Sequence, residues 1–537
     1  MGSLLGEGSR RDGAPRLLLI KARIENHRGE ASAPAQGTLY LGAVARALGW
    51  DVRSLDTYLV GDEARATLEA LREFPADVVG VSALTAESKS LHAIAAVARR
   101  AAPRALMLAG GPHASAEPEK TAADPSFDAV VIGEGERTLE DVLMHVTRRQ
   151  GIKNVPGICA RDTSGTPYRT ASRPYVQDLD ELPMPAWDLT DADAYQHRRG
   201  MSLAGLRRYM PISTSRGCPY RCSYCHDIHG KRFRSHSPLY VLRMIDDLRA
   251  RGIHHFDITD DIFNFDAERM MEICDGLIER GGIGFTCPNG VRADRMNLEQ
   301  VDKMARAGCE YVAIAIETAT PRLQKQIRKH LRFDKVQPII SAFTQRNVFT
   351  SGFFMVGFPS ETESELRATI DFALRSQLHA AYFFVVTPFG GTEMHEQVVT
   401  GMSAAAAELT GSGMYFRPVK NLSQVPDRLF YKIRREAYLR FYIDSKRIRR
   451  IWSAHPRRRN LIEYFATMFL RDALRIDVGR WLNKLSSLGR AERSGLPVAD
   501  VATPPSAPLS TIGSELVQLR RTNGASRKPA ELESRGV

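Results

Sequence analysis

The sequence lacks the features of several classes of protein. None of its apolar runs approaches the roughly 20 residues that span a bilayer, and its first residues lack the apolar stretch of a secretory signal peptide. Cysteine is scarce, at 7 in 537 residues, and unevenly spaced, which argues against a disulfide framework. These absences predict a cytoplasmic protein without membrane-spanning helices.

A large excess of one sign of charge is also absent from most of the chain. Apolar residues make up 43% and charged residues 25%, which is typical of globular proteins of several folding units. The net charge of +12 arises mainly in residues 432–475, which hold 13 basic and 4 acidic residues. We expect residues 426–485 to form basic helices that cover the core, with contact to a membrane surface through 430–476 as the alternative. No nucleic-acid partner is expected, because no recognised nucleic-acid module accompanies the charge.

The chain divides into segments of different pattern. Residues 16–150 alternate continuous aliphatic runs with helical stretches, which predicts an α/β, doubly wound, Rossmann-like domain. Residues 206–425 repeat the alternation with six strand-helix units, too few for a closed eight-fold barrel, so an open (βα)6 partial barrel is expected. Residues 151–205 are expected to be a linker that includes a hairpin. Residues 1–15 and 486–537 are expected to be disordered.

Ligands of a doubly wound domain bind beyond the carboxyl ends of its strands. Three loops at these ends, residues 82–87, 110–115 and 133–136, are rich in Gly, Ser or Thr, which let a ligand approach the backbone closely. A flavodoxin-like or NAD-binding domain is an alternative, although no G-x-G-x-x-G follows the first strand.

The strongest chemical signal is the loop R-G-C-P-Y-R-C-S-Y-C at residues 216–225, which directly follows the first strand of the second alternation. Its three thiolates, at spacing C-x3-C-x2-C, can hold three corners of a cubane iron–sulfur cluster and leave one iron open. A zinc knuckle completed by His226 or His229 is the alternative. The remaining cysteines are expected to be core residues; they are Cys159, Cys274, Cys287 and Cys309.

At this loop the sequence resembles the radical S-adenosylmethionine (SAM) superfamily. The resemblance implies a [4Fe-4S] cluster on Cys218, Cys222 and Cys225, with SAM chelated to the open iron. Polar and glycine residues at later strand ends resemble further motifs of that superfamily. The residues that the resemblance implies as SAM contacts are Tyr224, Asp260, Glu317 and Gly357. We expect Arg292 to be a solvated charge, with a contact to a SAM or substrate carboxylate as the alternative.

Together the two alternations resemble the subclass of radical SAM proteins with a cobalamin-binding domain ahead of the radical SAM core. The D-x-H-x-x-G motif, which supplies a histidine to cobalt in other cobalamin proteins, is absent. We therefore expect cobalt without a histidine ligand. The residues implied as cobalamin contacts are Ser82, Thr85, Gly110, Gly111, His113, Gly133, Glu134 and Gly135.

The resemblance implies an enzyme, most simply a C-methyltransferase that moves a methyl group from methylcobalamin to an unactivated carbon after hydrogen abstraction by a 5′-deoxyadenosyl radical. The expected partners are a small-molecule or lipid-like substrate and an external electron donor of the flavodoxin or ferredoxin type. One alternative is a non-methylating reaction, such as oxidative cyclisation or ring rearrangement on a tetrapyrrole, lipid or natural product. Another is a cobalamin-dependent sensor with a vestigial cluster.

Overall fold

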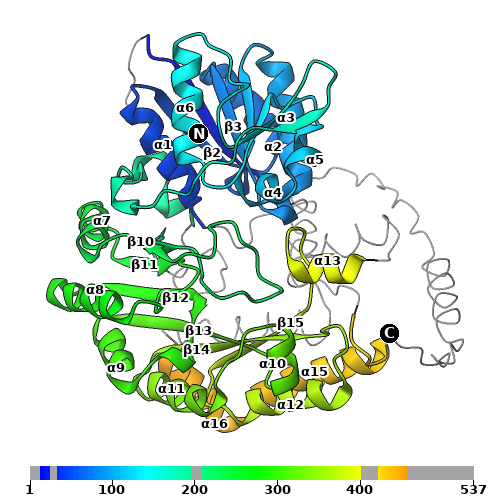
Figure 1. Ribbon diagram of the computed structural model, residues 1–537. Coiled ribbons are helices and arrows are strands. Elements are labelled where there is room, and N and C mark those ends of the chain that lie inside the picture. The colour runs from blue at the N-terminus through cyan, green and yellow to red at the C-terminus, as the bar shows by residue number, and fades with distance from the viewer. Residues whose placement is uncertain (1–12, 25–32, 196–206, 401–420, 456–537) are drawn as a thin grey trace, which may run out of the picture. The chain divides into compact units, whose positions relative to one another are not determined.

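The computed structural model describes residues 13–24, 33–195, 207–400 and 421–455 (Figure 1). Within these residues the chain forms two largely parallel sheets, one in each of the two alternating regions. No helix among them is long and apolar enough to cross a membrane. The expected disorder of residues 1–12 and 486–537 lies outside the described residues.

The first sheet has seven strands in the order β2-β1-β3-β4-β5-β6-β7. Its first five strands are parallel, and the reversal of strand order around β1 makes the domain doubly wound. Its strands are β1 (Arg16–Lys21), β2 (Asp51–Asp56), β3 (Val78–Ser82), β4 (Leu106–Gly110), β5 (Ala129–Val131), β6 (Ile158–Arg161) and β7 (Pro167–Arg169).

Helices cover both faces of this sheet because successive side chains of its strands point to opposite sides. Leu17 and Leu19 belong to a core with residues of α1 and α6, whereas Leu18 and Ile20 belong to a second core with residues of α2 and α3. Figure 1 shows these two helix layers on either side of the sheet. The helices are α1 (Gln36–Ala47), α2 (Glu63–Glu73), α3 (Ser88–Ala101), α4 (Gly111–Ala116), α5 (Pro118–Ala122) and α6 (Glu136–Thr147).

The predicted hairpin within residues 151–205 is present as β6 and β7. It joins the first sheet, because β5 and β6 pair antiparallel. Part of the expected linker is thus an extension of the first domain. The remaining described residues of this segment after the hairpin, 170–195, contain short helical turns, and Trp187 and Leu189 are buried in the same core as α1.

The second sheet has six parallel strands in the order β15-β14-β13-β12-β11-β8, which is their order in sequence. β8 and β15 do not pair, so the barrel is open, as predicted. Its strands are β8 (Tyr209–Ile212), β11 (His255–Ile258), β12 (Gly284–Val291), β13 (Cys309–Glu317), β14 (Phe349–Val356) and β15 (Ala380–Val385). The helices that follow them are α7 (Pro238–Ala250), α8 (Ala267–Arg280), α9 (Leu298–Arg306), α10 (Pro321–Gln326), α11 (Phe333–Gln345), α12 (Glu363–Arg375) and α13 (Glu393–Val399).

Two basic helices, α15 (Asp427–Ile443) and α16 (Ser445–Ala454), pack on the last strands of the barrel. Phe430, Phe441 and Ile451 are buried there. Arg434 donates a hydrogen bond to the carbonyl oxygen of Phe383, at 2.8 Å, and Arg447 donates to that of Ser376, at 3.1 Å. The described part of the basic segment therefore covers the barrel, as expected.

Candidate functional site

The three cysteines lie on one loop, residues 217–233, closed at its base by the short antiparallel pair β9 (Ser215–Arg216) and β10 (Arg234–Ser235). Gly217 has a φ of +83°, and a Cβ atom there would lie 2.3 Å from the carbonyl oxygen of Arg232. Only glycine allows the chain to enter the loop at this angle and this close to its return strand. The loop geometry therefore depends on the glycine that precedes Cys218.

All three thiols are free of disulfides. Burial raises the pKa of Cys218, and the Asp261 carboxylate and the Cys222 thiol act in the same direction. Neighbouring thiols that resist ionisation become thiolates when a cationic metal centre supplies the missing positive charge. The donor set therefore fits a cluster.

The zinc-knuckle alternative is not supported. Within the described parts of the chain, no three or more His, Cys, Asp or Glu side chains are grouped so that they could hold a metal ion, and this applies to the three thiols in either reading. The zinc reading also needs the imidazole of His226 or His229 as a fourth ligand. A zinc ion would draw its ligands together at about 2.3 Å for each thiolate. The imidazole of His229 instead lies 3.6 Å from the Glu134 carboxylate.

Two aspartates that follow β11, Asp260 and Asp261, accept hydrogen bonds from the residues that lead into the cysteine loop. Asp260 is buried and accepts hydrogen bonds from the backbone N–H of Thr214, at 2.6 Å, and from the hydroxyls of Thr214 and Ser215, at 2.5 and 2.6 Å. Burial raises the pKa of Asp260, against these hydrogen bonds and the charge of Arg269. Asp261 accepts a hydrogen bond from the N–H of Gly217, at 3.0 Å. Asp260 thus fixes the approach to the loop, and its contact with SAM stays a prediction.

Tyr224 and Glu317, both predicted SAM contacts, lie together. The Tyr224 hydroxyl donates a hydrogen bond to Glu317 Oε1, at 3.0 Å, and Lys329 Nζ lies 2.8 Å from the same oxygen. The side chains of Glu317 and Lys329 are each only 9% exposed. Glu317 has a φ of +64°, an uncommon value for a side chain with a Cβ atom. Backbone strain of this kind collects at functional sites.

Sequence reasoning missed Lys329. It stands within residues 320–346, where helices are expected, in the turn between α10 and α11. Its two neighbours, Arg328 and His330, have φ values of +55° and +53°, and this kink turns the lysine toward Glu317. No glycine or asparagine marks the kink, so the sequence carried no signal for it.

Arg292 was expected to be a solvated charge, and this expectation is wrong. Its side chain is 10% exposed and pairs with Asp294 at 3.0 Å. It also donates a hydrogen bond to the carbonyl oxygen of Lys329, at 2.6 Å, and its guanidinium lies 3.9 Å from the centre of the Tyr220 ring in the cysteine loop. A cation over an aromatic ring is attractive, so Arg292 ties this loop to the Lys329 segment.

Gly357, at the end of β14, has a φ of +89°, and its N–H donates a hydrogen bond to Glu361 Oε2, at 2.5 Å. Glu361 is fully buried, and its other carboxylate oxygen has no hydrogen-bond partner among the described residues. Burial raises the pKa of Glu361 to about 7, although the N–H groups of Gly357 and Phe358 favour the charged form. The Gly357 contact with SAM stays a prediction.

The carboxyl edge of the first sheet is open. A Cβ atom at Gly110 or at Gly133 would meet nothing within 4 Å, and Leu84, on the loop after β3, is 48% exposed. Gly111, with a φ of +86°, lies so close to β3 that its Cβ atom would be 2.6 Å from Ser82 Oγ. An apolar side chain beside bare backbone fits a large, flat, largely apolar ring.

His113, on α4, is 5% exposed, and its Nδ1 has no hydrogen-bond partner in the described parts of the chain. Burial lowers its pKa, so the neutral imidazole is favoured. Ser115 Oγ accepts a hydrogen bond from the N–H of Gly133, at 2.9 Å, and so joins two of the glycine-rich loops. The contacts of Ser82, Thr85 and His113 with cobalamin stay predictions.

Glu134, on the loop after β5, and Glu136, the first residue of α6, reach the base of the cysteine loop. Glu136 Oε1 lies 2.6 Å from a guanidinium nitrogen of Arg216, and Glu134 Oε1 lies 2.7 Å from one of Arg234. Burial opposes the charge of Glu134, but the nearby His229, the hydrogen bonds from Arg234 and the charge of Arg216 outweigh it and lower its pKa to about 2. Glu134, predicted as a cobalamin contact, is therefore already engaged by arginines.

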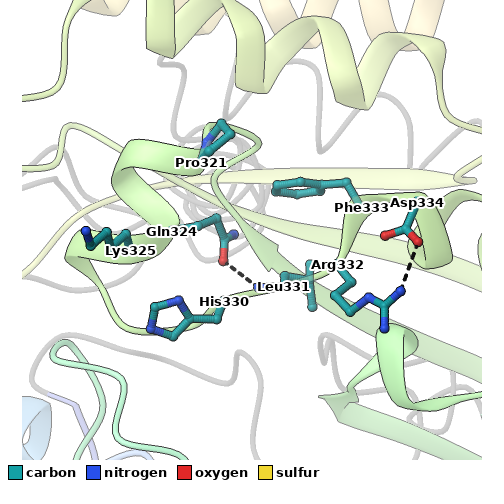
Figure 2. A pocket seen from close by; sticks show the side chains of 8 residues that line it. All are labelled: Pro321, Gln324, Lys325, His330, Leu331, Arg332, Phe333 and Asp334. Atoms are coloured by element: carbon teal, nitrogen blue, oxygen red, sulfur yellow. Dashed lines mark hydrogen bonds and ion pairs between the residues drawn. The ribbon is translucent and has the colours of Figure 1, made fainter.

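An open pocket of about 460 Å³ lies beside the Lys329 segment, between α10 and the start of α11 (Figure 2). Gln324 at its centre accepts a hydrogen bond from the N–H of Leu331, at 3.1 Å. None of the cysteines and none of the predicted SAM or cobalamin contacts lines it. The pocket is thus separate from the candidate site.

These features define a class: an α/β protein with an open, glycine-lined edge on a doubly wound sheet and a three-cysteine loop on a partial barrel. Comparison with known proteins agrees. Residues 29–143 match the model of the B12 binding domain, and residues 212–373 match that of the radical SAM superfamily. The chain therefore belongs to the radical SAM enzymes that carry a B12-binding domain, whose cofactors are a [4Fe-4S] cluster, SAM and cobalamin.

Similar proteins extend this comparison. An uncharacterized methyltransferase of Pyrococcus horikoshii, PH0819, is 28% identical over 422 residues, 77% of this chain and 89% of the relative. An anaerobic magnesium-protoporphyrin IX monomethyl ester cyclase of Cereibacter sphaeroides is 27% identical over 384 residues, 68% of this chain and 60% of the relative. The radical SAM methyltransferase TsrM of Kitasatospora setae has the same fold, with a TM-score of 0.59 and 20% identity over 72% of this chain and 75% of TsrM.

Proposed function

We propose that the protein is a cobalamin-dependent radical SAM C-methyltransferase that acts on an unactivated carbon of a small-molecule or lipid-like substrate. The observation that carries the proposal is the contact between the loop after β5, expected to face cobalamin, and Arg216, two residues before the first cluster cysteine. Methyl transfer to a substrate radical needs both cofactors at one cavity, because the reacting atoms must come within about 3.5 Å of each other.

When bound, the cluster and SAM supply a carbon-centred radical and cobalamin supplies a methyl group. The chain holds the cluster on Cys218, Cys222 and Cys225. Arg292, Asp260 and Asp261 keep the cysteine loop in place through the contacts described above. The open glycine edge leaves room for the corrin ring. We expect the electron to come from an external donor of the flavodoxin or ferredoxin type.

The test is an anaerobic reconstitution with iron, sulfide, hydroxocobalamin, SAM and a strong reductant. We expect both 5′-deoxyadenosine and S-adenosylhomocysteine, because one SAM is cleaved to the radical and another gives up its methyl group. The matched control is Cys222→Ala, which should lose 5′-deoxyadenosine. A product without S-adenosylhomocysteine would contradict methyl transfer.

A non-methylating cyclisation or rearrangement is the second candidate, and the similarity to a cyclase favours it. It predicts 5′-deoxyadenosine without S-adenosylhomocysteine, and a product whose mass has not gained a CH2 unit. Failure of the reconstituted protein to cleave SAM at all would instead favour a cobalamin-dependent sensor.

We further propose that the end of α15 and the outward side of α16 contact an anionic lipid surface. Ile443, Ile448 and Trp452 are 69%, 43% and 49% exposed, and Lys446 and Arg449 beside them are also exposed. Apolar side chains flanked by basic ones favour negatively charged membranes. Sedimentation with phosphatidylserine vesicles should fall several-fold in an Ile448→Ser/Trp452→Ser variant. Equal binding by this variant would contradict the proposal.

A further inference from the structure

The base of the cysteine loop carries two arginines side by side. Arg216 on β9 and Arg234 on β10 are direct partners in the antiparallel pair. Their side chains are 9% and 3% exposed. Like charges directly opposite each other repel, and burial strengthens the repulsion, so the base of this loop needs negative charge from elsewhere.

The loop after β5 and the first residue of α6 supply that charge. Glu134 Oε1 lies 2.7 Å from Arg234 and 3.4 Å from Arg216, and Glu136 lies 2.6 Å from Arg216. The two glutamate side chains are only 5% and 6% exposed. Two carboxylates thus balance two guanidinium groups in a buried group of four, which we call the four-residue ion network.

Other groups around the network leave the arginines little freedom. Arg234 donates hydrogen bonds to the carbonyl oxygens of His229, at 2.9 Å, and Val176, at 2.5 Å, and lies over the ring of Tyr175. Arg216 lies over the ring of Tyr40, at 5.4 Å from its centre. A guanidinium held by fixed acceptors and an aromatic face keeps one orientation.

The residues of the four-residue ion network lie next to both predicted cofactor sites in the sequence. Glu134 stands between Gly133 and Gly135, in a loop predicted to contact cobalamin. Arg216 stands two residues before Cys218, and Arg234 closes the same loop from its other end. A buried ion pair adds little net stability over a well-packed apolar pair but is costly when one partner is removed. The network therefore suits the holding of two loops in one relative position.

We propose that Glu134, Glu136, Arg216 and Arg234 are positioning residues that couple cobalamin binding at the first sheet to the conformation of the cluster-bearing cysteine loop. The inference rests on the cofactors of the proposed function and deepens it by assigning a link between their two sites. Coupling of this kind is reciprocal: a filled cluster site favours cobalamin, and bound cobalamin favours the ordered cluster loop to the same extent.

The test measures the affinity for hydroxocobalamin by equilibrium dialysis, with the full chain in its cluster-free and reconstituted forms. We expect the reconstituted wild type to bind at least about fivefold more tightly, the lower end of typical coupling between sites. In Glu134→Gln, which keeps the shape and removes the charge, the two affinities should become equal. The electron paramagnetic resonance spectrum of the reduced cluster should shift on addition of cobalamin in the wild type and not in this variant.

Two further variants keep the test decisive. Glu140→Gln is the matched control, because Glu140 lies on the same helix as Glu136 but pairs with Arg137 near the surface; it should keep the wild-type ratio of affinities. If Glu134→Gln alone does not fold, the neutral pair Glu134→Gln/Arg234→Gln removes one charge of each sign and should fold without coupling.

Equal affinities in the two wild-type forms, or an unchanged ratio of affinities in the neutral pair, would overturn the proposal. Neither measurement uses a methyl acceptor, so a failed methyl transfer assay leaves this test intact.

Discussion

The carboxyl edges of the two sheets differ at their glycines, although both edges carry buried carboxylates that pair with charged groups. At the second sheet, buried carboxylates accept hydrogen bonds or pair with charges, as at Asp260, Glu317 and Glu361. At the first sheet, Gly110 and Gly133 leave space that side chains would fill. A loop that holds a cluster has few backbone hydrogen bonds of its own and needs support from outside, whereas a broad planar cofactor needs bare backbone.

The largest effect is expected at the cluster. Cys222→Ala should lower iron and sulfide content and reduce 5′-deoxyadenosine to background, because the proposed cluster site has three thiolates and two are too few to hold the cluster. Iron analysis and product quantification check this. Cys274→Ala is the control, since Cys274 is buried in α8 away from the loop, and it should keep the cluster. Full iron content in Cys222→Ala would show that the cysteine loop does not hold the cluster.

The next largest effect is expected at the carboxyl edge of the second sheet, where buried carboxylates are paired. Lys329→Met removes the charge that pairs with the buried carboxylate of Glu317 and should cost about 4 kcal/mol of unfolding free energy. Glu317→Gln/Lys329→Met should recover most of this loss, because neither charge is then left alone. Urea denaturation midpoints measure both. Lys303→Met, which breaks the exposed pair with Asp275, should cost at most about 1 kcal/mol. Equal losses of unfolding free energy in Lys329→Met and Lys303→Met would show that the buried pair of Lys329 and Glu317 stabilises the fold no more than an exposed pair does.

Glu361 makes the stability of the same edge depend on pH. Its folded pKa of about 7 lies above the value of an unfolded glutamate, so the folded state holds the proton between about pH 4.5 and 7. The resulting stabilisation is complete below about pH 4.5 and is lost as the pH rises through 7, a change of about 3 kcal/mol. The melting temperature of the wild type should therefore fall between pH 5 and 8 more than that of Glu361→Gln. Glu365→Gln, whose wild-type carboxyl has a pKa of about 2 because of its hydrogen bond from Arg322, should keep the wild-type slope.

The smallest expected effect lies at the open edge. Gly110→Leu places a side chain where a Cβ atom meets nothing, so the melting temperature should stay within a few degrees of the wild type. Cobalamin should bind about tenfold more weakly, equivalent to about 1.4 kcal/mol. Equilibrium dialysis and thermal melts check the two parts. Gly151→Leu, another open glycine placed after α6, is the control and should leave cobalamin affinity unchanged. Unaltered affinity in Gly110→Leu would show that this edge does not hold the ring.

Much of the fold could be predicted because it rests on local patterns. Continuous aliphatic runs such as residues 16–20 and 309–316 became parallel strands, and the helical stretches between them became covering helices. The turn between α10 and α11 shows where such prediction stops: its backbone has positive φ at Arg328 and His330 without a glycine, and contacts of Lys329 with Tyr224 and Glu317 stabilise it.

The candidate site was predicted only in part, for a related reason. The three cysteines lie on one loop and are recognisable by their spacing alone. Arg292 was misjudged, because its partners Tyr220 and the carbonyl oxygen of Lys329 are tens of residues away. Glu134 was assigned to a ligand, because nothing near it in sequence indicates its arginine partners.

The sequence by itself determined the three-cysteine loop, the order of strands and helices, and the glycines at the carboxyl edge of the first sheet, since each depends on neighbouring residues. Only the tertiary structure decided that Glu134 and Glu136 neutralise Arg216 and Arg234, and that Lys329 meets Glu317 and Tyr224. The physical reason is that a buried charge must find its partner in space, and the partner's place in the sequence is free.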